Sequence, residues 1–278
     1  DGFWNDMNEP AMWGKHMPLA VQFDYDGNKA TALGAKNVYG LQMTRATFEG
    51  VQKLMGNKRP FLLTRAAFSG IQRYSSIWTG DNNPTDDHML TGVRLVNSLG
   101  LSGVPFAGAD ISGFTGNATS DLFTRWMSIG VFTPLFRSHK SINAGESEPW
   151  SYGIKTENLV RSYIELRYRL MPYIYSTFYE SSVTGLPVSR SLMINETYNE
   201  NVYDHQFENQ YMFGSSILVN PCKSTESIVK VYLPEGKWYD FYNDKLKEGG
   251  RVITVESPLN RLPLFVKANG IKKKKKIT

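Results

Sequence analysis

The stretch from Asp1 to Pro10, DGFWNDMNEP, decides how the rest of the chain is interpreted. Gly2-Phe3-Trp4 is a short apolar run typical of the end of a buried strand, and the residues after Asn5 form a polar turn that proline ends. Carboxylates at the C-terminal end of a strand are where barrel enzymes keep their chemistry. Asp6 and Glu9 also fit an ordinary turn and helix cap, which is the more common role of an isolated D-x-x-E, so the context has to decide.

The composition is that of a globular protein whose body carries no net charge. The chain has 278 residues, and 41% of them are hydrophobic, which is enough for a substantial core. The formal net charge of +5 comes from five consecutive lysines, Lys272 to Lys276, and without them no net charge remains. A neutral body gives no electrostatic reason to expect nucleic acid or a membrane as a partner, and no run of about 18 apolar residues marks a membrane span. Aromatic residues make up 13%, which suits stacking on sugar rings as well as core packing.

No metal or other cofactor is predicted. His16, His88 and His205 have no ligand spacing, and the single cysteine, Cys222, permits neither a cysteine-based metal site nor an internal disulfide. The chain lacks both G-x-G-x-x-G and the P-loop, so a nucleotide cofactor has no support. The lone cysteine favours a reducing compartment, and a cytoplasmic location is therefore expected.

Beyond the first ten residues, apolar bursts alternate with helical periodicity. Residues 11–35 have no clear period and are expected to form a long loop above a site. Helical spacing covers residues 38–55, 89–99 and 122–129, and Thr85 and Asp86 are cap candidates before the second of these stretches. The apolar bursts cover residues 61–63, 74–78, 104–109 and 133–136, and they lead to the polar tips Thr64-Arg65, Thr79 to Asn82, Asp110, and Arg137 with His139. This alternation predicts a parallel sheet with crossover helices, in a (β/α) barrel with one shared site.

The barrel predicted in this way is incomplete. With Phe3-Trp4 the chain has five strands where a closed barrel needs eight, so we expect it to begin midway through a larger enzyme. A long helix over residues 157–182, kinked at Pro172, follows the last of these strands.

Past Val188 the pattern changes to short β-like runs separated by turn residues, at the spacing of a β-sandwich. These runs cover residues 188–194, 211–213, 217–219, 228–233, 238–242, 252–255 and 262–266. The predicted organisation is the second part of a (β/α)8 barrel over residues 1–186, an antiparallel β-sandwich over 187–270, and a polylysine tail over 271–278 that is expected to be disordered.

Three aspartates, Asp6, Asp81 and Asp110, follow different predicted strands. Two carboxylates that face each other across a sugar can cleave a glycosidic bond when one is ionised and the other protonated. Any one of these aspartates alone is more often a loop cap or a salt-bridge partner. It is their joint placement on successive tips that favours a catalytic site.

Six segments in order resemble the signatures of glycoside hydrolase family 31, the α-glucosidases, and the resemblance extends to about residue 269. They are Trp4 to Pro10 and residues 63–65, 78–82, 108–114, 136–139 and 166–173. The resemblance implies a retaining double displacement in which Asp6 attacks the anomeric carbon. Asp81 would first protonate the departing oxygen and then activate water, with the two carboxyl groups about 5–5.5 Å apart.

The resemblance also implies a pocket for the sugar at the non-reducing end. Residues Arg65, Asp110 and His139 would bind its hydroxyls, Trp4, Met7, Trp78 and Phe114 would form the walls, and Glu9 and Arg137 would support them. A polar pocket of this kind rejects sugars that lack a matching hydroxyl, because its own groups would be left unpaired.

The predicted function is that of an exo-acting α-glucosidase, with an α-glucoside oligosaccharide as its substrate and partner. Two alternatives stay open: a family 31 relative that uses another α-linked sugar or transfers the glucosyl group to an acceptor sugar, and a non-catalytic sugar-binding fragment. Asn5 and Met7 favour glucosidase over xylosidase by resemblance only. Family members carry further barrel strands before the nucleophile, so the chain alone is expected to be poorly soluble or inactive. Linkage preference and oligomeric state are not predicted.

Overall fold

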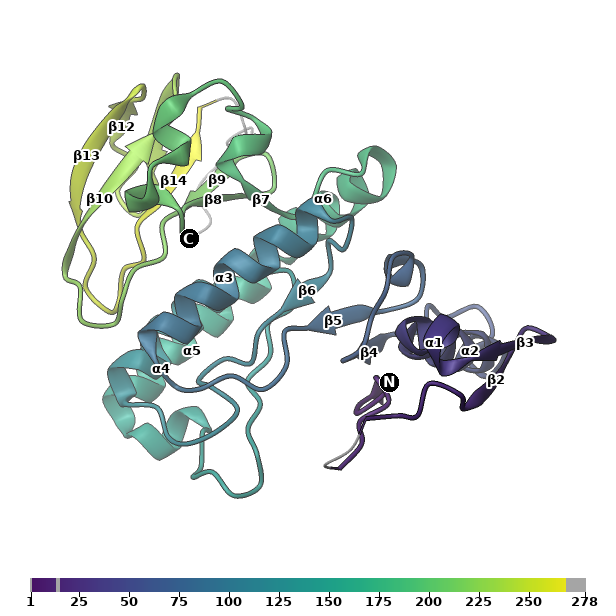
Figure 1. Ribbon diagram of the computed structural model, residues 1–278. Helices are drawn as coiled ribbons and strands as arrows, with labels where there is room; N and C mark the ends of the chain where they lie inside the picture. The colour runs from purple at the N-terminus through teal and green to yellow at the C-terminus, as the bar shows by residue number, and fades with distance from the viewer. Residues whose placement is uncertain (1, 14–15, 269–278) are drawn as a thin grey trace. The chain divides into compact units, whose positions relative to one another are not determined.

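The computed structural model describes residues 2–13 and 16–268, and the chain forms two compact units, residues 1–80 and 81–278 (Figure 1). Asp1 and the tail predicted over residues 271–278 lie outside the described residues. The boundary predicted between residues 186 and 187 falls inside the second unit and stays a prediction.

Three short parallel strands form the sheet of the first unit. They are β1 (Phe3–Asn5), β4 (Leu62–Thr64) and β5 (Ser76–Trp78), in that order, with Trp4 opposite Leu63 and Leu63 opposite Ser76. All three residues of β4 and of β5 are buried, as expected for parallel strands covered on both faces. The predicted parallel sheet is therefore confirmed for this unit.

The loop predicted over residues 11–35 is wrong in part. The structure has an antiparallel hairpin here, formed by β2 (Gln22–Tyr25) and β3 (Asn28–Thr31), and then the short helix α1 (Ala32–Ala35). The sequence of β3 shows no alternation of apolar and polar residues, because three of its four residues are exposed and the fourth is only half-buried. Helix α2 (Tyr39–Met55) follows, close to the predicted range.

The second unit begins with the barrel part and its helices. Its elements up to residue 184 are α3 (Asp86–Leu101), β6 (Ala107–Gly108), α4 (Ser120–Gly130), α5 (Ile154–Arg169) and α6 (Met171–Thr184). Threonine side chains cap two of the helices: Thr85 Oγ1 accepts from His88 N at 3.1 Å, and Thr119 Oγ1 accepts from Leu122 N at 3.2 Å.

The long kinked helix predicted over residues 157–182 is instead two helices that meet at Leu170. Pro172 lies in the first turn of α6, where its missing N–H would have no helical partner in any case. The proline therefore begins a helix and does not kink one.

The strand predicted over residues 133–136 is wrong, since none of these residues is in a strand, and a single parallel bridge between Ile111 and Ser138 lies just beyond them. The reason is Arg167 of α5, whose Nη1 donates to the carbonyls of Val131 at 2.6 Å and Thr133 at 2.7 Å. Its Nη2 donates to Pro134 O at 2.9 Å. The arginine thus donates hydrogen bonds to carbonyl groups that would otherwise accept from a neighbouring strand. Burial of the guanidinium group lowers the pKa of Arg167 to about 10.

The remainder of the second unit is antiparallel. Its strands are β7 (Ser189–Ser191), β8 (Tyr211–Phe213), β9 (Ile217–Val219), β10 (Ile228–Leu233), β11 (Lys237–Asp240), β12 (Leu246–Glu248), β13 (Arg251–Glu256) and β14 (Leu264–Lys267). Six of them form a sheet in the order β12-β11-β14-β9-β8-β7, and β10 pairs with β13. Val231, Trp238 and Phe265 belong to the apolar cluster between the two layers. All the predicted runs contain strand, and β12 is an addition.

Short 3-10 helices connect these elements: η1 (Lys36–Val38), η2 (Ile71–Arg73), η3 (Pro149–Tyr152), η4 (Leu192–Ile194), η5 (Glu200–Tyr203) and η6 (His205–Phe207). The barrel part and the sandwich share one core, since Phe123 and Phe132 pack in the same cluster as Tyr211 and Phe213. Tyr211 also donates its hydroxyl to Phe132 O at 2.8 Å. Among the described residues no helix is both long and apolar enough to cross a membrane.

Candidate active site

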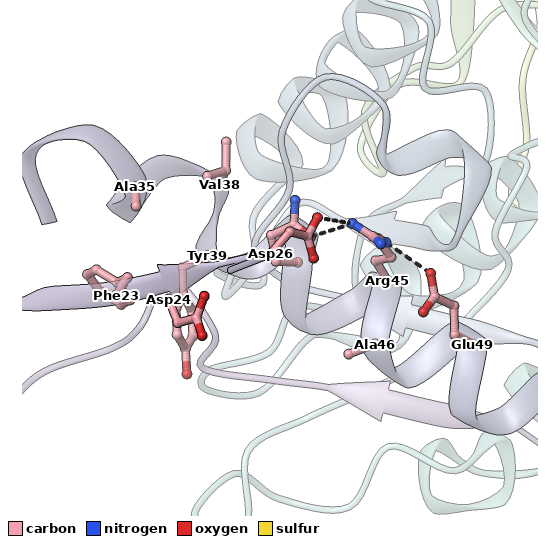
Figure 2. A pocket seen from close by; sticks show the side chains of 10 residues that line it. Phe23, Asp24, Asp26, Ala35, Val38, Tyr39, Arg45, Ala46 and Glu49 are labelled. Carbon is pink, nitrogen blue, oxygen red and sulfur yellow. Dashed lines mark hydrogen bonds and ion pairs between the residues drawn. The ribbon is translucent and has the colours of Figure 1, made fainter. Parts of the chain in front are cut away.

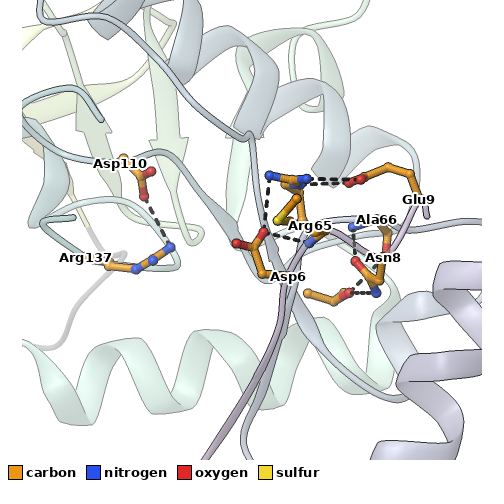
Figure 3. Close-up of polar contacts among 9 residues, drawn as sticks. Asp6, Asn8, Glu9, Arg65, Ala66, Asp110 and Arg137 are labelled. Atoms are coloured by element: carbon orange, nitrogen blue, oxygen red, sulfur yellow. Dashed lines mark hydrogen bonds and ion pairs between the residues drawn. The ribbon is translucent and has the colours of Figure 1, made fainter. Parts of the chain in front are cut away.

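Asp6 follows β1 at the start of the polar turn, beside Arg65 at the tip of β4 (Figure 3). Its Oδ1 accepts a hydrogen bond from Met7 N at 2.8 Å and lies 3.3 Å from Arg65 Nη1. Met7 has a φ of 54°, a conformation that is uncommon for any residue but glycine and that is found at functional sites. A third of the Asp6 side chain is exposed, so its carboxylate is both oriented and accessible.

Glu9 holds Arg65 in place through two hydrogen bonds. Arg65 Nε donates to Glu9 Oε1 at 2.8 Å, and Nη2 donates to Oε2 at 3.1 Å. A bidentate pair of this kind is strong and fixes the plane of the guanidinium group. The hydrogen bond from Arg65 holds the pKa of Glu9 below its ordinary value. Glu9 is therefore ionised at neutral pH and keeps Arg65 beside Asp6.

Asn8 supports the same turn, although the sequence did not single it out. Its Nδ2 donates to Thr64 Oγ1 at 2.9 Å, its Oδ1 accepts from Ala66 N at 3.0 Å, and the residue is buried. Helix α2 packs closely behind the turn, because a Cβ on Gly40 would lie 2.9 Å from Asn8 O. The available signal was the position of Asn8 inside the signature, between Met7 and Glu9.

Two tryptophans of the first unit form a pair in which one ring supports the other. The ring centroids of Trp4 and Trp78 are 5.8 Å apart with the planes tilted by 57°. Trp4 is half exposed and Met7 is also exposed, whereas Trp78 is buried. Trp4 and Met7 can thus offer a surface to a ligand, and Trp78 mainly fixes the Trp4 ring.

In the second unit, Asp110 follows β6 and is fully buried. Its Oδ1 lies 3.3 Å from Arg137 Nη1 (Figure 3). Asn82 fixes the surrounding backbone, since its Nδ2 donates to Asp110 O at 2.9 Å and its Oδ1 accepts from Phe114 N at 2.9 Å. The sequence missed Asn82 as a structural residue, because its partners lie 28 and 32 residues away.

Phe114 and His139 stack on each other, with ring centroids 5.4 Å apart and the planes 27° from parallel. The loop before Phe114 depends on Gly113, which has a φ of 82° and where a Cβ would lie 2.5 Å from Pro84 N. Asp81, just ahead of Asn82, is exposed at the start of the unit.

The structure therefore groups the predicted residues into two sets. Trp4, Asp6, Met7, Glu9, Arg65 and Trp78 belong to the first unit, and Asp81, Asp110, Phe114, Arg137 and His139 to the second. The predicted separation of about 5–5.5 Å between Asp6 and Asp81 stays a prediction, as do the assigned roles. Within residues 2–13 and 16–268, no three His, Cys, Asp or Glu side chains gather as ligands for a metal ion.

Two family descriptions match the chain, and together they cover nearly all of it. They are the glycosyl hydrolases family 31 TIM-barrel domain over residues 1–177 and the glycosyl hydrolase family 31 C-terminal domain over residues 185–271. The fold and the carboxylate-bearing strand tips are those of a barrel-type glycoside hydrolase with a β-sandwich after the barrel. The chain belongs to glycoside hydrolase family 31, which confirms the resemblance seen in the sequence.

Curated relatives align over almost the whole chain. It is 42% identical to Alpha-glucosidase 2 of Bacillus thermoamyloliquefaciens over 270 residues, which is 96% of this chain and 34% of that protein. It is 38% identical to a probable glucan 1,3-alpha-glucosidase of Arabidopsis thaliana, over 96% of this chain and 29% of that protein. The chain thus spans about a third of the length of these relatives.

Solved structures agree with this assignment. A Flavobacterium johnsoniae family 31 dextranase complexed with isomaltotriose is 36% identical, with a TM-score of 0.85 over 96% of this chain and 34% of that one. A glucosidase II alpha subunit is 29% identical, with a TM-score of 0.89 over 96% of this chain and 29% of that one. The predicted fold class, part of a (β/α)8 barrel followed by a β-sandwich, is confirmed.

Proposed function

We propose that the protein that contains this chain is a retaining, exo-acting α-glucosidase that releases terminal glucose from α-glucoside oligosaccharides. The observation that carries the proposal is the carboxylate of Asp6, which Met7 N and Arg65 orient while a third of the side chain stays open to solvent. The names of the relatives support the substrate class, since several of them are α-glucosidases.

The proposed reaction has two displacements. In the first, Asp6 attacks the anomeric carbon and forms a glycosyl ester, the glycosidic bond breaks, and Asp81 gives its proton to the departing oxygen. In the second, Asp81 takes a proton from water, the water oxygen attacks the same carbon, and the ester bond to Asp6 breaks. Glucose leaves with its α configuration retained, and both carboxyl groups return to their initial states.

Arg65 has two tasks in this proposal. Its positive charge lies beside the Asp6 carboxylate, and its guanidinium group donates to a sugar hydroxyl. Asp110 and His139 bind further hydroxyls of the terminal sugar, with Phe114 stacked on His139 and Arg137 beside Asp110. Because Asp110 is fully buried, a sugar without the matching hydroxyl would leave a desolvated carboxylate poorly paired. The cytoplasmic location stays a prediction.

The test follows the configuration of the first product. The complete enzyme is mixed with an aryl α-glucoside, and proton NMR is recorded before the released sugar mutarotates. We expect α-glucose first, and from a linear malto-oligosaccharide we expect only glucose and the oligosaccharide that is one unit shorter as early products. Asp6→Asn should lower kcat by about 10⁴-fold or more, as expected for loss of a nucleophile, whereas Asp121→Asn, an exposed carboxylate on α4, should leave it unchanged. Initial release of β-glucose, or turnover that survives Asp6→Asn, would refute the mechanism.

A further inference from the structure

A cavity of about 200 Å³ lies in the first unit beside the β2–β3 hairpin and α2 (Figure 2). Phe23, Asp24 and Asp26 line it from the hairpin, and Tyr39, Arg45 and Glu49 line it from the helix. None of its lining residues belongs to the proposed catalytic set. The cavity is therefore separate from the proposed catalytic residues of this unit.

One side of this cavity is apolar. The rings of Phe23 and Tyr39 meet edge to face, with centroids 5.8 Å apart and an interplanar angle of 62°. Small apolar side chains, Ala35, Val38 and Ala46, also line the cavity. Tyr39 is more than a third exposed, so its ring is open to a ligand.

The other side is polar and contains both donors and acceptors. Arg45 Nη1 donates to Asp26 Oδ2 at 2.7 Å, and Arg45 Nε donates to Glu49 Oε1 at 2.9 Å. Asp24 Oδ1 accepts from Gly27 N at 2.7 Å, and its other oxygen has no donor within the described part of the chain. The polar side thus presents a preorganised guanidinium group together with carboxylate oxygens.

These features select a class of ligand. Three carboxylates against one arginine give the lining a net negative charge, which disfavours an anion. A cationic ligand would need only hydrogen-bond acceptors. The acceptors of Asp26 and Glu49 already bind Arg45, which lies between them. A neutral polyhydroxyl ring can contact the guanidinium donor, the carboxylate acceptors and the aromatic rings together. Each of its hydroxyls both donates and accepts, and its C–H face packs on an aromatic side chain. The volume is below the roughly 300–1,000 Å³ of sites for drug-sized ligands, so it suits a single ring.

We propose that this cavity binds one pyranose unit of a neutral α-glucan, with the sugar face on Tyr39 and its hydroxyls on Asp24 and Arg45. The choice of an α-glucan rests on the proposed function. Tyr39 adjoins Gly40, the residue through which α2 packs on the Asn8 turn. The same helix therefore supports both the nucleophile turn and the proposed sugar site, which would hold a distant unit of a long substrate.

Tyr39→Ala in the complete enzyme tests the proposal, with Tyr39→Phe and Leu54→Ala as matched variants. Leu54 is exposed on the same helix and lies outside the cavity. Tyr39→Ala should lower kcat/KM on soluble starch by roughly 3- to 10-fold, the size of one lost stacking contact. It should leave kcat/KM on an aryl α-glucoside within about twofold, because that substrate is too short to use the cavity. Both matched variants should resemble the parent enzyme on both substrates.

A direct binding measurement separates this proposal from the catalytic one. Retardation in gels that contain soluble starch is measured in the Asp6→Asn background, with and without Tyr39→Ala, and we expect Tyr39→Ala to reduce the retardation. Unchanged retardation, or an equal loss on the short and long substrates, would overturn the sugar site. Saturable binding of lysine amide that Asp24→Asn abolishes, with no binding of maltotriose, would overturn it in favour of a cation site. Absence of aryl α-glucosidase activity in the parent enzyme would instead refute the proposed function and leave the gel result to decide the cavity.

Discussion

The two units each carry an aspartate paired with an arginine, and the two pairs differ in their exposure to water. Asp6 Oδ1 and Asp110 Oδ1 both lie 3.3 Å from an arginine Nη1, but the Asp6 side chain is 33% exposed and that of Asp110 is 0% exposed. At equal distance, a pair that excludes water interacts more strongly and is more damaging to break. The comparison shows that the carboxylate proposed to react is partly exposed, whereas the one proposed to recognise a hydroxyl is buried against its arginine.

Among variants that leave the proposed nucleophile in place, the largest expected effect tests the buried pair. Asp110→Asn keeps the shape of the side chain but leaves Arg137 facing a neutral group, and breaking one partner of a buried charge pair costs about 2–5 kcal/mol. We therefore expect kcat/KM on an aryl α-glucoside to fall by roughly 30- to 1,000-fold or more, measured by steady-state kinetics.

The control for this variant is Glu165→Gln, the same chemical change at an exposed position of α5. It should leave both kcat/KM and the free energy of unfolding unchanged. If Asp110→Asn behaves like this control, the buried carboxylate has no part in recognition and the contrast between the two aspartates is lost.

The next effect concerns the backbone around the buried pair. Asn82→Ala removes the amide that donates to Asp110 O and accepts from Phe114 N, and Asn82 is buried. Leaving buried polar groups unpaired costs about 1–3 kcal/mol, so the free energy of unfolding in urea should fall by that amount. Asn158→Ala, at an exposed site on α5, should change it by no more than about 0.5 kcal/mol. Equal effects of the two variants would show that Asn82 does not hold this loop.

The smallest effect tests the exposed pair through its second partner. Glu9→Gln weakens the bidentate contact that keeps Arg65 beside Asp6, and we expect kcat to fall about 10-fold with a smaller change in KM. A loss confined to KM would mean that Glu9 does not position Arg65 for the reaction.

The pH dependence of the same variant adds an independent measurement. The folded-state pKa of Glu9 lies below 4.5, so its ionised form stabilises the folded protein above pH 4.5. That stabilisation is lost as the pH falls through the folded-state pKa. Since the Glu9 side chain is 42% exposed, the contribution should be less than about 1 kcal/mol. The difference in melting temperature between the parent enzyme and Glu9→Gln should therefore be present at pH 7 and should shrink as the pH falls below 4.5.

Elements with a strong period were predicted from the sequence, and elements defined by distant contacts were not. Helix α2 and strands β4 and β5 lie close to their predicted positions because burial imposes a pattern on neighbouring residues. The β2–β3 hairpin was missed because most of its residues are exposed and carry no such pattern. The strand predicted at residues 133–136 is replaced by carbonyl contacts to Arg167, which lies more than 30 residues away.

The sequence by itself determined the family and the set of chemical groups, because six signatures in order place aspartates, arginines and aromatic residues after successive strands. Only the tertiary structure decided how those groups are paired and how far each is exposed. Arg65 reaches Glu9 across 56 residues and Arg137 reaches Asp110 across 27, and no local pattern encodes such contacts. Exposure depends on everything that packs around a side chain, so two aspartates that look alike in the opening signature and at a later strand tip take opposite environments.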